Sequence, residues 1–119
     1  MTDAPICNKA AYLSFCDDVG AEDAAEVLVA FFEDTGLKVN ALPSLADRQV
    51  IKREAHSIKS SSATFGFARL SALGRDLEFG AETTSPADLQ TMIAAIQQAF
   101  DATKTFAQKE MLGAGLAVA

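Results

Sequence analysis

The most informative stretch of the chain is DRQVIKREAHSIKSSSATFG, which covers residues 47–66. Its apolar and small residues recur every three or four positions, at Ile51, Ala55, Ile58, Ser62 and Phe65. That spacing places them on one face of an α-helix, since a helix has about 3.6 residues per turn. Asp47 can cap the start of this helix, and Gly66 is suited to its end. The stretch therefore predicts an amphipathic helix that packs against other elements.

The same spacing on the N-terminal side of this stretch predicts two further helices. We expect a short helix from about Asn8 to Asp18, ended by Gly20. A longer helix should run from about Glu22 to Leu42, where Pro43 ends the pattern. Its inward face consists of Ala24, Leu28, Phe31, Thr35, Val39 and Leu42.

Two helices are also predicted after Gly66. The first turns Leu70, Leu73 and Leu77 inward and breaks near Gly80. The second begins at Ser85, because this hydroxyl cap is followed by Pro86 in the first turn and by Asp88 three residues after the cap. Its apolar face consists of Leu89, Met92, Ile96, Phe100, Thr103 and either Phe106 or Ala107.

Strand signals are weak, so these amphipathic helices must bury their apolar faces against one another. We therefore predict an all-α protein, namely an antiparallel up-down four-helix bundle with a short extra N-terminal helix. The 119 residues suit one domain, which we place at residues 1–112. The small residues at 113–119 are expected to form a frayed tail.

The composition argues against several classes of protein. Ten basic and sixteen acidic side chains give a net charge of −6, which disfavours binding to nucleic acid. The apolar runs are shorter than the about 18 residues that a membrane span needs, and the first residues lack a secretory signal pattern. We therefore expect a cytoplasmic protein with no membrane partner. Cys7 and Cys16 form no CxxC pair and the chain has one histidine, so we expect reduced, buried thiols and no metal site.

The positive charges are concentrated around that histidine, His56. From Arg48 to Arg75 there are six basic side chains and one acidic one, whereas the rest of the chain has four basic and fifteen acidic side chains. Two interpretations are open at this point: solvated helix faces, or a positive surface that steers an acidic partner into place. The position of His56 in the middle of the segment favours the second.

His56 follows the core residue Ala55, so its side chain points about 100° away from the core of the predicted bundle. The face around it includes Gln49, Lys52, Ser60 and Ala63, with Arg53 and Lys59 on either side of His56. Neutral imidazole is a nucleophile near neutral pH, since its pKa in model peptides is about 6.5. Lys59 is long enough to reach a phosphoryl group on His56, and small neighbours leave room for another protein. This face favours phosphoryl transfer, against the more common alternative of an ordinary surface histidine.

Other candidate sites have less support. Ser60, Ser61 and Ser62 lack a nucleophile elbow and a base–acid pair, so we expect them to serve helix packing. Glu78 and Glu82 lie one turn apart but lack the Glu-x-x-His pairs of carboxylate di-metal bundles. The sequence contains no glycine-rich phosphate-binding motif, so we expect no ATP site.

The stretch around His56 also carries a longer pattern. Residues 55–66 read AHSIKSSSATFG and are followed by Leu70, Leu73, Leu77 and Glu78. This pattern resembles the signature of histidine phosphotransfer (HPt) domains, which is Ala-His-x-Leu-Lys-Gly, then small residues, a glycine placed as Gly66 is here, and a leucine-rich helix ending in Leu-Glu. The close match covers 24 residues, from 55 to 78, and the helix pattern from residue 8 to residue 109 agrees more loosely.

The resemblance implies a monomeric helical bundle that works with the receiver domains of response regulators and with a hybrid histidine kinase. His56 would accept a phosphoryl group from the aspartate of one receiver and pass it to another, and Lys59 would stabilise it. Gln49, Lys52, Arg53, Ser60 and Ala63 would contact the partner. The chain would hold no cofactor, and Mg²⁺ would belong to the receiver domain.

One position departs from the family pattern, because Ser60 stands where the family usually has glycine. The added hydroxymethyl group would tune the choice of partner, bond to the phosphohistidine, or slow transfer. Our main hypothesis is a phosphocarrier without enzymatic use of ATP. The alternative is a phosphate-independent helical module that docks on a kinase or receiver domain and inhibits it. A metal-dependent or hydrolytic enzyme ranks last, because no set of ligands supports it.

Overall fold

The structure is a computed structural model, and it describes residues 3–111. This part of the chain is helical and contains no β-strand. Its α-helices are α1 (Lys9–Val19), α2 (Ala21–Ala41), α3 (Arg48–Thr64), α4 (Ala68–Gly80) and α5 (Pro86–Phe106). A short 3-10 turn, Leu42–Ser44, follows α2, and a π-helical turn, Ala107–Met111, follows α5. The all-α prediction is therefore confirmed.

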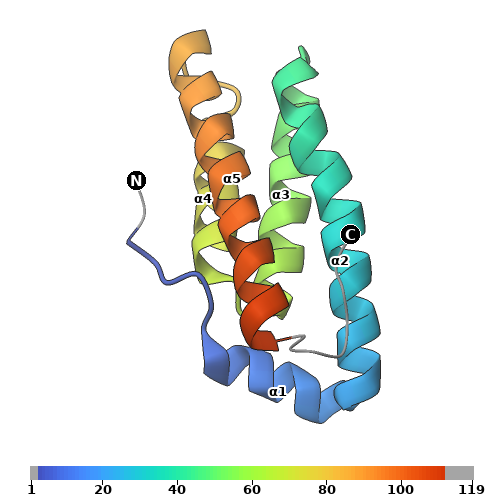
Figure 1. Cartoon of the computed structure of the whole chain (residues 1–119). Helices are drawn as coiled ribbons and strands as arrows, with labels where there is room; N and C mark the ends of the chain where they lie inside the picture. The colour runs from blue at the N-terminus through green and yellow to red at the C-terminus, as the bar shows by residue number, and fades with distance from the viewer. Residues whose placement is uncertain (1–2, 112–119) are drawn as a thin grey trace.

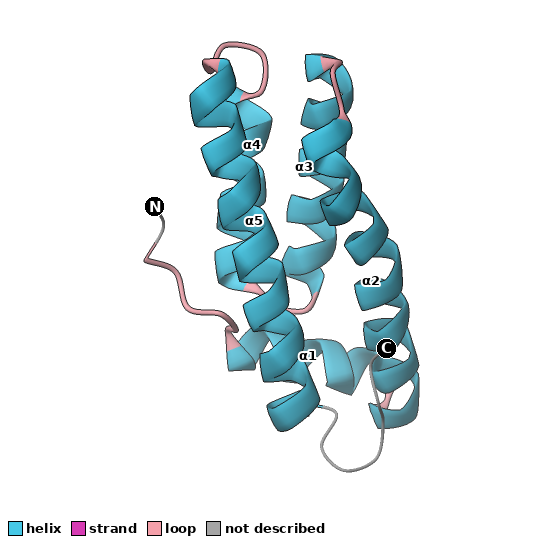
Figure 2. Cartoon of the chain, turned by 45° about the horizontal axis from the view of Figure 1, so that its top comes forward, coloured by secondary structure: helices cyan, strands magenta, loops and turns pink. Residues whose placement is uncertain are grey.

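Four of the helices form a bundle, and the fifth closes one end of it. Figure 1 shows α2, α3, α4 and α5 side by side, whereas α1 lies across the bottom of the view. The loops in Figure 2 connect α2 to α3 and α4 to α5 at one end of the bundle, and α3 to α4 at the other. The most extensive helix pairing is that of α3 with α4. The short N-terminal helix therefore sits at the end of the bundle where α3 turns into α4.

The predicted caps Asp47 and Ser85 are present, and Asn8, which was expected to lie at the start of the first helix, caps α1. The side chain of Asn8 accepts from the backbone N–H of Ala11, that of Asp47 from Gln49, and that of Ser85 from Asp88. Each cap satisfies a backbone donor that has no partner within its helix. At the other end of α2, Leu42 belongs to the 3-10 turn rather than to the helix, because Pro43 cannot continue the helical hydrogen bonds.

The inward faces that we predicted for the residue ranges of α2 and α3 are buried throughout. In α4 and α5 the predicted faces need correction, because Leu73 and Met92 are only half-buried. Gly74 and Ile93 are buried instead. The reason in α4 is that Gly74 brings the helix close to α3, so Leu73 is left at the margin. At the end of α5, Ala107 is the buried residue of the two that we considered.

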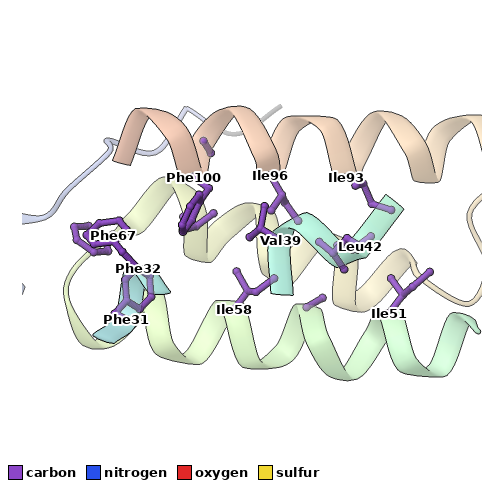
Figure 3. Close-up of a cluster of buried hydrophobic side chains, with 14 of the residues drawn as sticks. Phe31, Phe32, Val39, Leu42, Ile51, Ile58, Phe67, Ile93, Ile96 and Phe100 are labelled. Carbon is purple, nitrogen blue, oxygen red and sulfur yellow. The ribbon is translucent and has the colours of Figure 1, made fainter. Parts of the chain in front are cut away.

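Phenylalanine rings fill the core at the α1 end of the bundle (Figure 3). The rings of Phe31 and Phe65 have centroids 5.1 Å apart, and Phe32 lies 5.8 Å from Phe67. Phe15 of α1 packs on Phe65 with a centroid distance of 4.8 Å. Such tilted aromatic pairs contribute stability beyond the area that they bury. Helix α1 is therefore packed on the end of α3.

The chain before α1 is also tied to the turn between α3 and α4. The backbone N–H of Asn8 donates to the carbonyl of Gly66 at 2.6 Å, and that of Arg69 donates to Pro5 at 2.9 Å. The Arg69 side chain adds a hydrogen bond from Nε to the carbonyl of Ala4 at 3.0 Å. These bonds hold the N-terminal segment beside the C-terminal end of α3.

The expected frayed tail at residues 113–119 lies outside the described residues. Cys7 and Cys16 are free thiols that are half-buried rather than fully buried, and burial raises the pKa of Cys7. Across residues 3–111, no helix combines the length and the apolar character needed to cross a bilayer.

We expect Ser62→Ala to stabilise the protein. Ser62 is fully buried and its hydroxyl has no hydrogen-bond partner, a situation that costs about 1–3 kcal/mol. Urea unfolding should therefore show an unfolding free energy about 1 kcal/mol higher in the variant. Ser60→Ala, at an exposed position of the same helix, measures the gain from helix propensity alone. Equal gains in the two variants would show that the buried hydroxyl costs nothing.

Candidate functional site

The imidazole of His56 is exposed on the outer face of α3. Its side chain is 61% exposed, whereas the preceding residue, Ala55, is fully buried. The structure therefore bears out the orientation that we predicted from the helical period. A protein that approaches α3 from this side meets the histidine ring directly.

A carboxylate from α4 holds the ring in place. Nδ1 of His56 lies 2.7 Å from Oε2 of Glu78, and Nζ of Lys59 donates to the other oxygen, Oε1, also at 2.7 Å. We call these three residues the His56–Glu78–Lys59 cluster. Glu78 is 13% exposed and Lys59 is 28% exposed, so only the histidine projects into solvent. Lys59, which the helical period places beside His56, is therefore half-buried.

The close approach of α3 and α4 brings the cluster together. A Cβ atom at Gly74 would lie 3.0 Å from the backbone nitrogen of Lys59 and 3.2 Å from the carbonyl of Ala55. The hydroxyl of Ser71 donates to the carbonyl of Lys59 at 3.0 Å. Glu78 lies one turn beyond Gly74 on α4. The small residue in α4 therefore brings the carboxylate within bonding distance of His56.

The cluster favours an ionised carboxylate and one tautomer of the histidine. The hydrogen bond from Lys59 is the main cause that lowers the pKa of Glu78; desolvation opposes it, and His56 adds to the lowering. An ionised carboxylate only accepts hydrogen bonds, so the proton it shares with the ring belongs to Nδ1 of His56. In the neutral ring the lone pair is then on Nε2, which is the nitrogen that Glu78 does not contact.

The lowered pKa of Glu78 predicts how this carboxylate contributes to stability at different pH. The contribution should be complete above the ordinary pKa of 4.5 and be lost as the pH falls through the lower pKa of the folded state. We therefore expect wild type to unfold at higher urea than Glu78→Gln near pH 7. The difference in unfolding urea concentration between wild type and Glu78→Gln should disappear as the pH falls below 4.5. A gap that is constant from pH 7 to pH 3, or that widens in acid, would contradict the ion-paired geometry.

The other predicted site residues lie on the exposed side of α3, and one of them, Lys52, is paired with a carboxylate. Gln49, Arg53, Ser60 and Ala63 are all exposed. Lys52 is also exposed, and its Nζ is 2.9 Å from Glu82, a contact that raises the pKa of Lys52. Carboxylates that follow in the sequence therefore offset part of the positive segment that we identified around His56.

Two residues near His56 were missed by the sequence reasoning as parts of a site. The sequence pattern presents Glu78 only as a candidate metal ligand and as part of a family signature, and it does not predict the contact with His56. Phe79 follows it in α4, is 72% exposed, and has a ring centroid 6.0 Å from Nζ of Lys59. The signal available in the sequence is Gly74, because an isolated glycine inside a helical pattern indicates a packing reason at that position, one turn before Glu78.

The described residues, 3–111, hold no group of three or more histidine, cysteine or acidic side chains arranged to bind a metal ion. The chemistry that the arrangement offers is that of an accessible imidazole with an ammonium group one turn along the helix.

The chain matches a model of a protein family. The model of the Hpt domain family matches residues 21–105, which is well over half of the chain and includes the whole His56–Glu78–Lys59 cluster. Neither the curated proteins nor the solved structures contain a match to the chain.

Proposed function

Because the chain belongs to the Hpt domain family, whose members serve histidine phosphotransfer in phosphorelays, we propose that His56 is its phosphoacceptor. In this proposal His56 accepts a phosphoryl group from the aspartate of one receiver domain and passes it to the aspartate of another. The observation that carries the proposal is the exposed ring of His56 with Nδ1 held at 2.7 Å by Glu78.

The chemistry requires no base. The lone pair on Nε2 of His56 attacks phosphorus, the N–P bond forms, and the bond between phosphorus and the aspartyl oxygen breaks, so the receiver carboxylate leaves with the electron pair. The proton on Nδ1 stays in its hydrogen bond with Glu78, whose negative charge offsets the positive charge of the phosphorylated ring. The reverse sequence delivers the phosphoryl group to the second receiver.

Lys59 has a separate role in the proposal. Phosphoryl transfer depends on positioning and on charge that balances the phosphoryl oxygens. The ammonium of Lys59 is one helical turn from His56 and is oriented by Glu78 at 2.7 Å. A fixed ammonium loses less entropy when the phosphoryl group arrives than a freely rotating one.

The proposal extends to the partners and the location. The chain is a phosphocarrier rather than an ATP-consuming enzyme, it holds no cofactor, and Mg²⁺ belongs to the receiver domain. Gln49, Lys52, Arg53, Ser60 and Ala63 contact the receiver, and a hybrid histidine kinase supplies the phosphoryl group. We propose that the protein works as a monomer in the cytoplasm.

A phosphotransfer profile tests the function. The chain is incubated with each phosphorylated receiver domain of the source organism, and labelling is sampled at short times. The proposal expects fast labelling by a small set of receivers, with a phosphate that is labile in acid and stable in base. If none of the receivers labels the chain, the proposal is wrong.

The second candidate function is the phosphate-independent module that binds and inhibits a kinase or receiver. Ser60 favours it, because its exposed side chain occupies the position next to the phosphoacceptor face where the family usually has glycine. Stable binding of a receiver without any exchange of phosphate would support this candidate over the relay function.

We expect Lys59→Ala to slow phosphotransfer about 100-fold or more, as when one charge-stabilising donor is removed from other active sites. It should also lower the unfolding free energy by about 1–2 kcal/mol, because Glu78 is largely buried and loses its ammonium partner. Quenched-flow labelling and urea unfolding measure the two effects. Lys38→Ala, which removes a lysine whose Nζ lies 3.4 Å from a carboxylate oxygen of Glu54, is the matched control and should transfer normally. Equal transfer rates in both variants would remove the proposed role of Lys59.

A further inference from the structure

One side of α4 forms a row beside the phosphoacceptor. Ala68, Ala72, Arg75 and Phe79 recur at intervals of four, three and four residues, so they share one face of the helix. We call these four residues the α4 row. It lies next to the side of α3 that carries Lys59 and Ala63.

A groove of about 350 Å³ lies at the α1 end of this row. Its lining includes Ala11 of α1, Lys59 and Ala63 of α3, and Ala72 and Arg75 of α4. Lys59 also lies 6.0 Å from the ring centroid of Phe79. The groove and the exposed phenylalanine therefore belong to one continuous surface with Lys59 between them.

This surface lies close enough to His56 for one docked protein to cover both. A standard interface covers about 800 Å² on each partner, which corresponds to a disc of about 16 Å radius. Ala63 is seven residues from His56 on the same helix, a distance of about 10 Å along the axis. Phe79 directly follows Glu78, which contacts His56. Both ends of the surface therefore lie within reach of a protein docked over His56.

Charge distinguishes this side of α3 from the other side. Helix α2 carries five carboxylates and one lysine, whereas α4 carries two arginines and two carboxylates. A partner that donates from an aspartyl phosphate brings negative charge to the interface. It is repelled more by α2 than by α4, where the Arg75 side chain is 57% exposed and its Nη2 lies 3.8 Å from the exposed carboxylate of Asp76.

We propose that the docking surface for the receiver domain extends from the α3 residues named above over the α4 row and its groove, a step that rests on the proposed phosphotransfer function. The receiver places an apolar side chain in the groove, packs a second against Phe79, and sets an acidic side chain against Arg75. Phenylalanine and arginine are enriched at protein interfaces, and arginine is among the residue types that most often dominate binding energy. Because Asn8 and Ala11 also line the groove, and because both lie outside the family match at residues 21–105, the N-terminal segment helps to choose the partner.

The test uses the receiver domain that labels the wild-type chain fastest, and it measures kcat and KM for transfer in three variants. Phe79→Ala should raise KM about tenfold and leave kcat within about twofold, because docking is weakened and the His56–Glu78–Lys59 cluster is intact. Arg75→Glu should also raise KM about tenfold, with a larger effect at low salt. The matched control is Leu37→Ala, since Leu37 is 73% exposed on α2, and its KM should equal that of wild type.

The outcomes separate this inference from the proposed function. If the wild-type chain is labelled and Phe79→Ala and Arg75→Glu both keep a wild-type KM, the docking surface is wrong and the phosphotransfer function stands. A rise in KM for Leu37→Ala alone would place the receiver on α2 and would also overturn the inference. Absence of labelling in the wild-type chain overturns the proposed function itself. Circular dichroism checks that each variant is folded, and both tested side chains are exposed enough for this to be expected.

Discussion

Replacing His56 with glutamine should abolish phosphorylation of the chain by every receiver domain that labels the wild type. An amide nitrogen has its lone pair delocalised into the carbonyl and is not a nucleophile, so no N–P bond can form. His56 is the only histidine in the sequence, and no second imidazole can replace it. The expected effect is loss of labelling to background, measured by autoradiography after short incubations.

The same variant should remain folded, which makes the result interpretable. The side chain of His56 is 61% exposed and contributes nothing to the buried core. Loss of its hydrogen bond with Glu78 leaves the bond from Lys59 in place. Thermal unfolding of His56→Gln should therefore differ little from that of wild type. Retained labelling in a folded His56→Gln protein would assign the phosphate to another residue, and stability in acid would point to one of the serines.

Gly66→Ala should be the most destabilising single substitution among those considered for this chain. Gly66 has a φ of 77°, a conformation that costs a residue with a Cβ atom about 1–3 kcal/mol. The added Cβ would also lie 2.5 Å from the carbonyl oxygen of Asn8 and 3.0 Å from the Cβ of Ala11. Strain and collision together should lower the unfolding free energy by about 3 kcal/mol or more.

Gly20→Ala is the matched control for this prediction. Gly20 has a φ of 87°, but nothing lies within 4 Å of the position that its Cβ would take. It should therefore show the cost of a positive-φ backbone without a collision; with φ 87° and ψ 151° this cost is about 1–3 kcal/mol. Urea unfolding of the two variants measures the difference. Equal losses would mean that the collision with Asn8 and Ala11 adds no cost to Gly66→Ala, contrary to this prediction.

The collision at Gly66 also connects stability with function. Relief of the collision would move Asn8 and Ala11 away from the turn between α3 and α4, and both residues line the groove beside Lys59. Folded Gly66→Ala protein should consequently show altered receiver preference as well as lower stability.

Local patterns in the sequence were sufficient to predict the helices. Asp47 and Ser85 cap the helices that they were expected to cap, because a cap depends on residues only two or three positions away. The inward faces expected in the ranges of α2 and α3 are buried, because a long amphipathic helix has a single apolar face. The predictions for Leu73 and Met92 were wrong because either of two adjacent residues could face the core. The packing of a neighbouring helix determines that Gly74 and Ile93 are buried instead.

The site was predicted less completely, because it depends on the register between helices. The exposure of His56 follows from its own helix and was foreseen. Its contact with Glu78, which is 22 residues away in the sequence, depends on how far α4 slides along α3. Gly74 and Ser71 set that register through contacts with the backbone of Lys59, and no periodicity in one helix encodes such contacts. The same limit explains why counting charges overestimated the free positive charge around His56.

The most direct measurement is the bonding of the phosphoryl group in the phosphorylated chain. In a sample labelled with ¹⁵N in histidine, the only labelled ring nitrogens are Nδ1 and Nε2 of His56, since the sequence has one histidine. Long-range ¹H–¹⁵N correlation spectra should show phosphorus bonded to Nε2 of His56 and a proton retained on Nδ1 beside Glu78. Phosphorus on Nδ1, or unchanged histidine signals in a chain that carries phosphate, would contradict the geometry on which the proposed function rests.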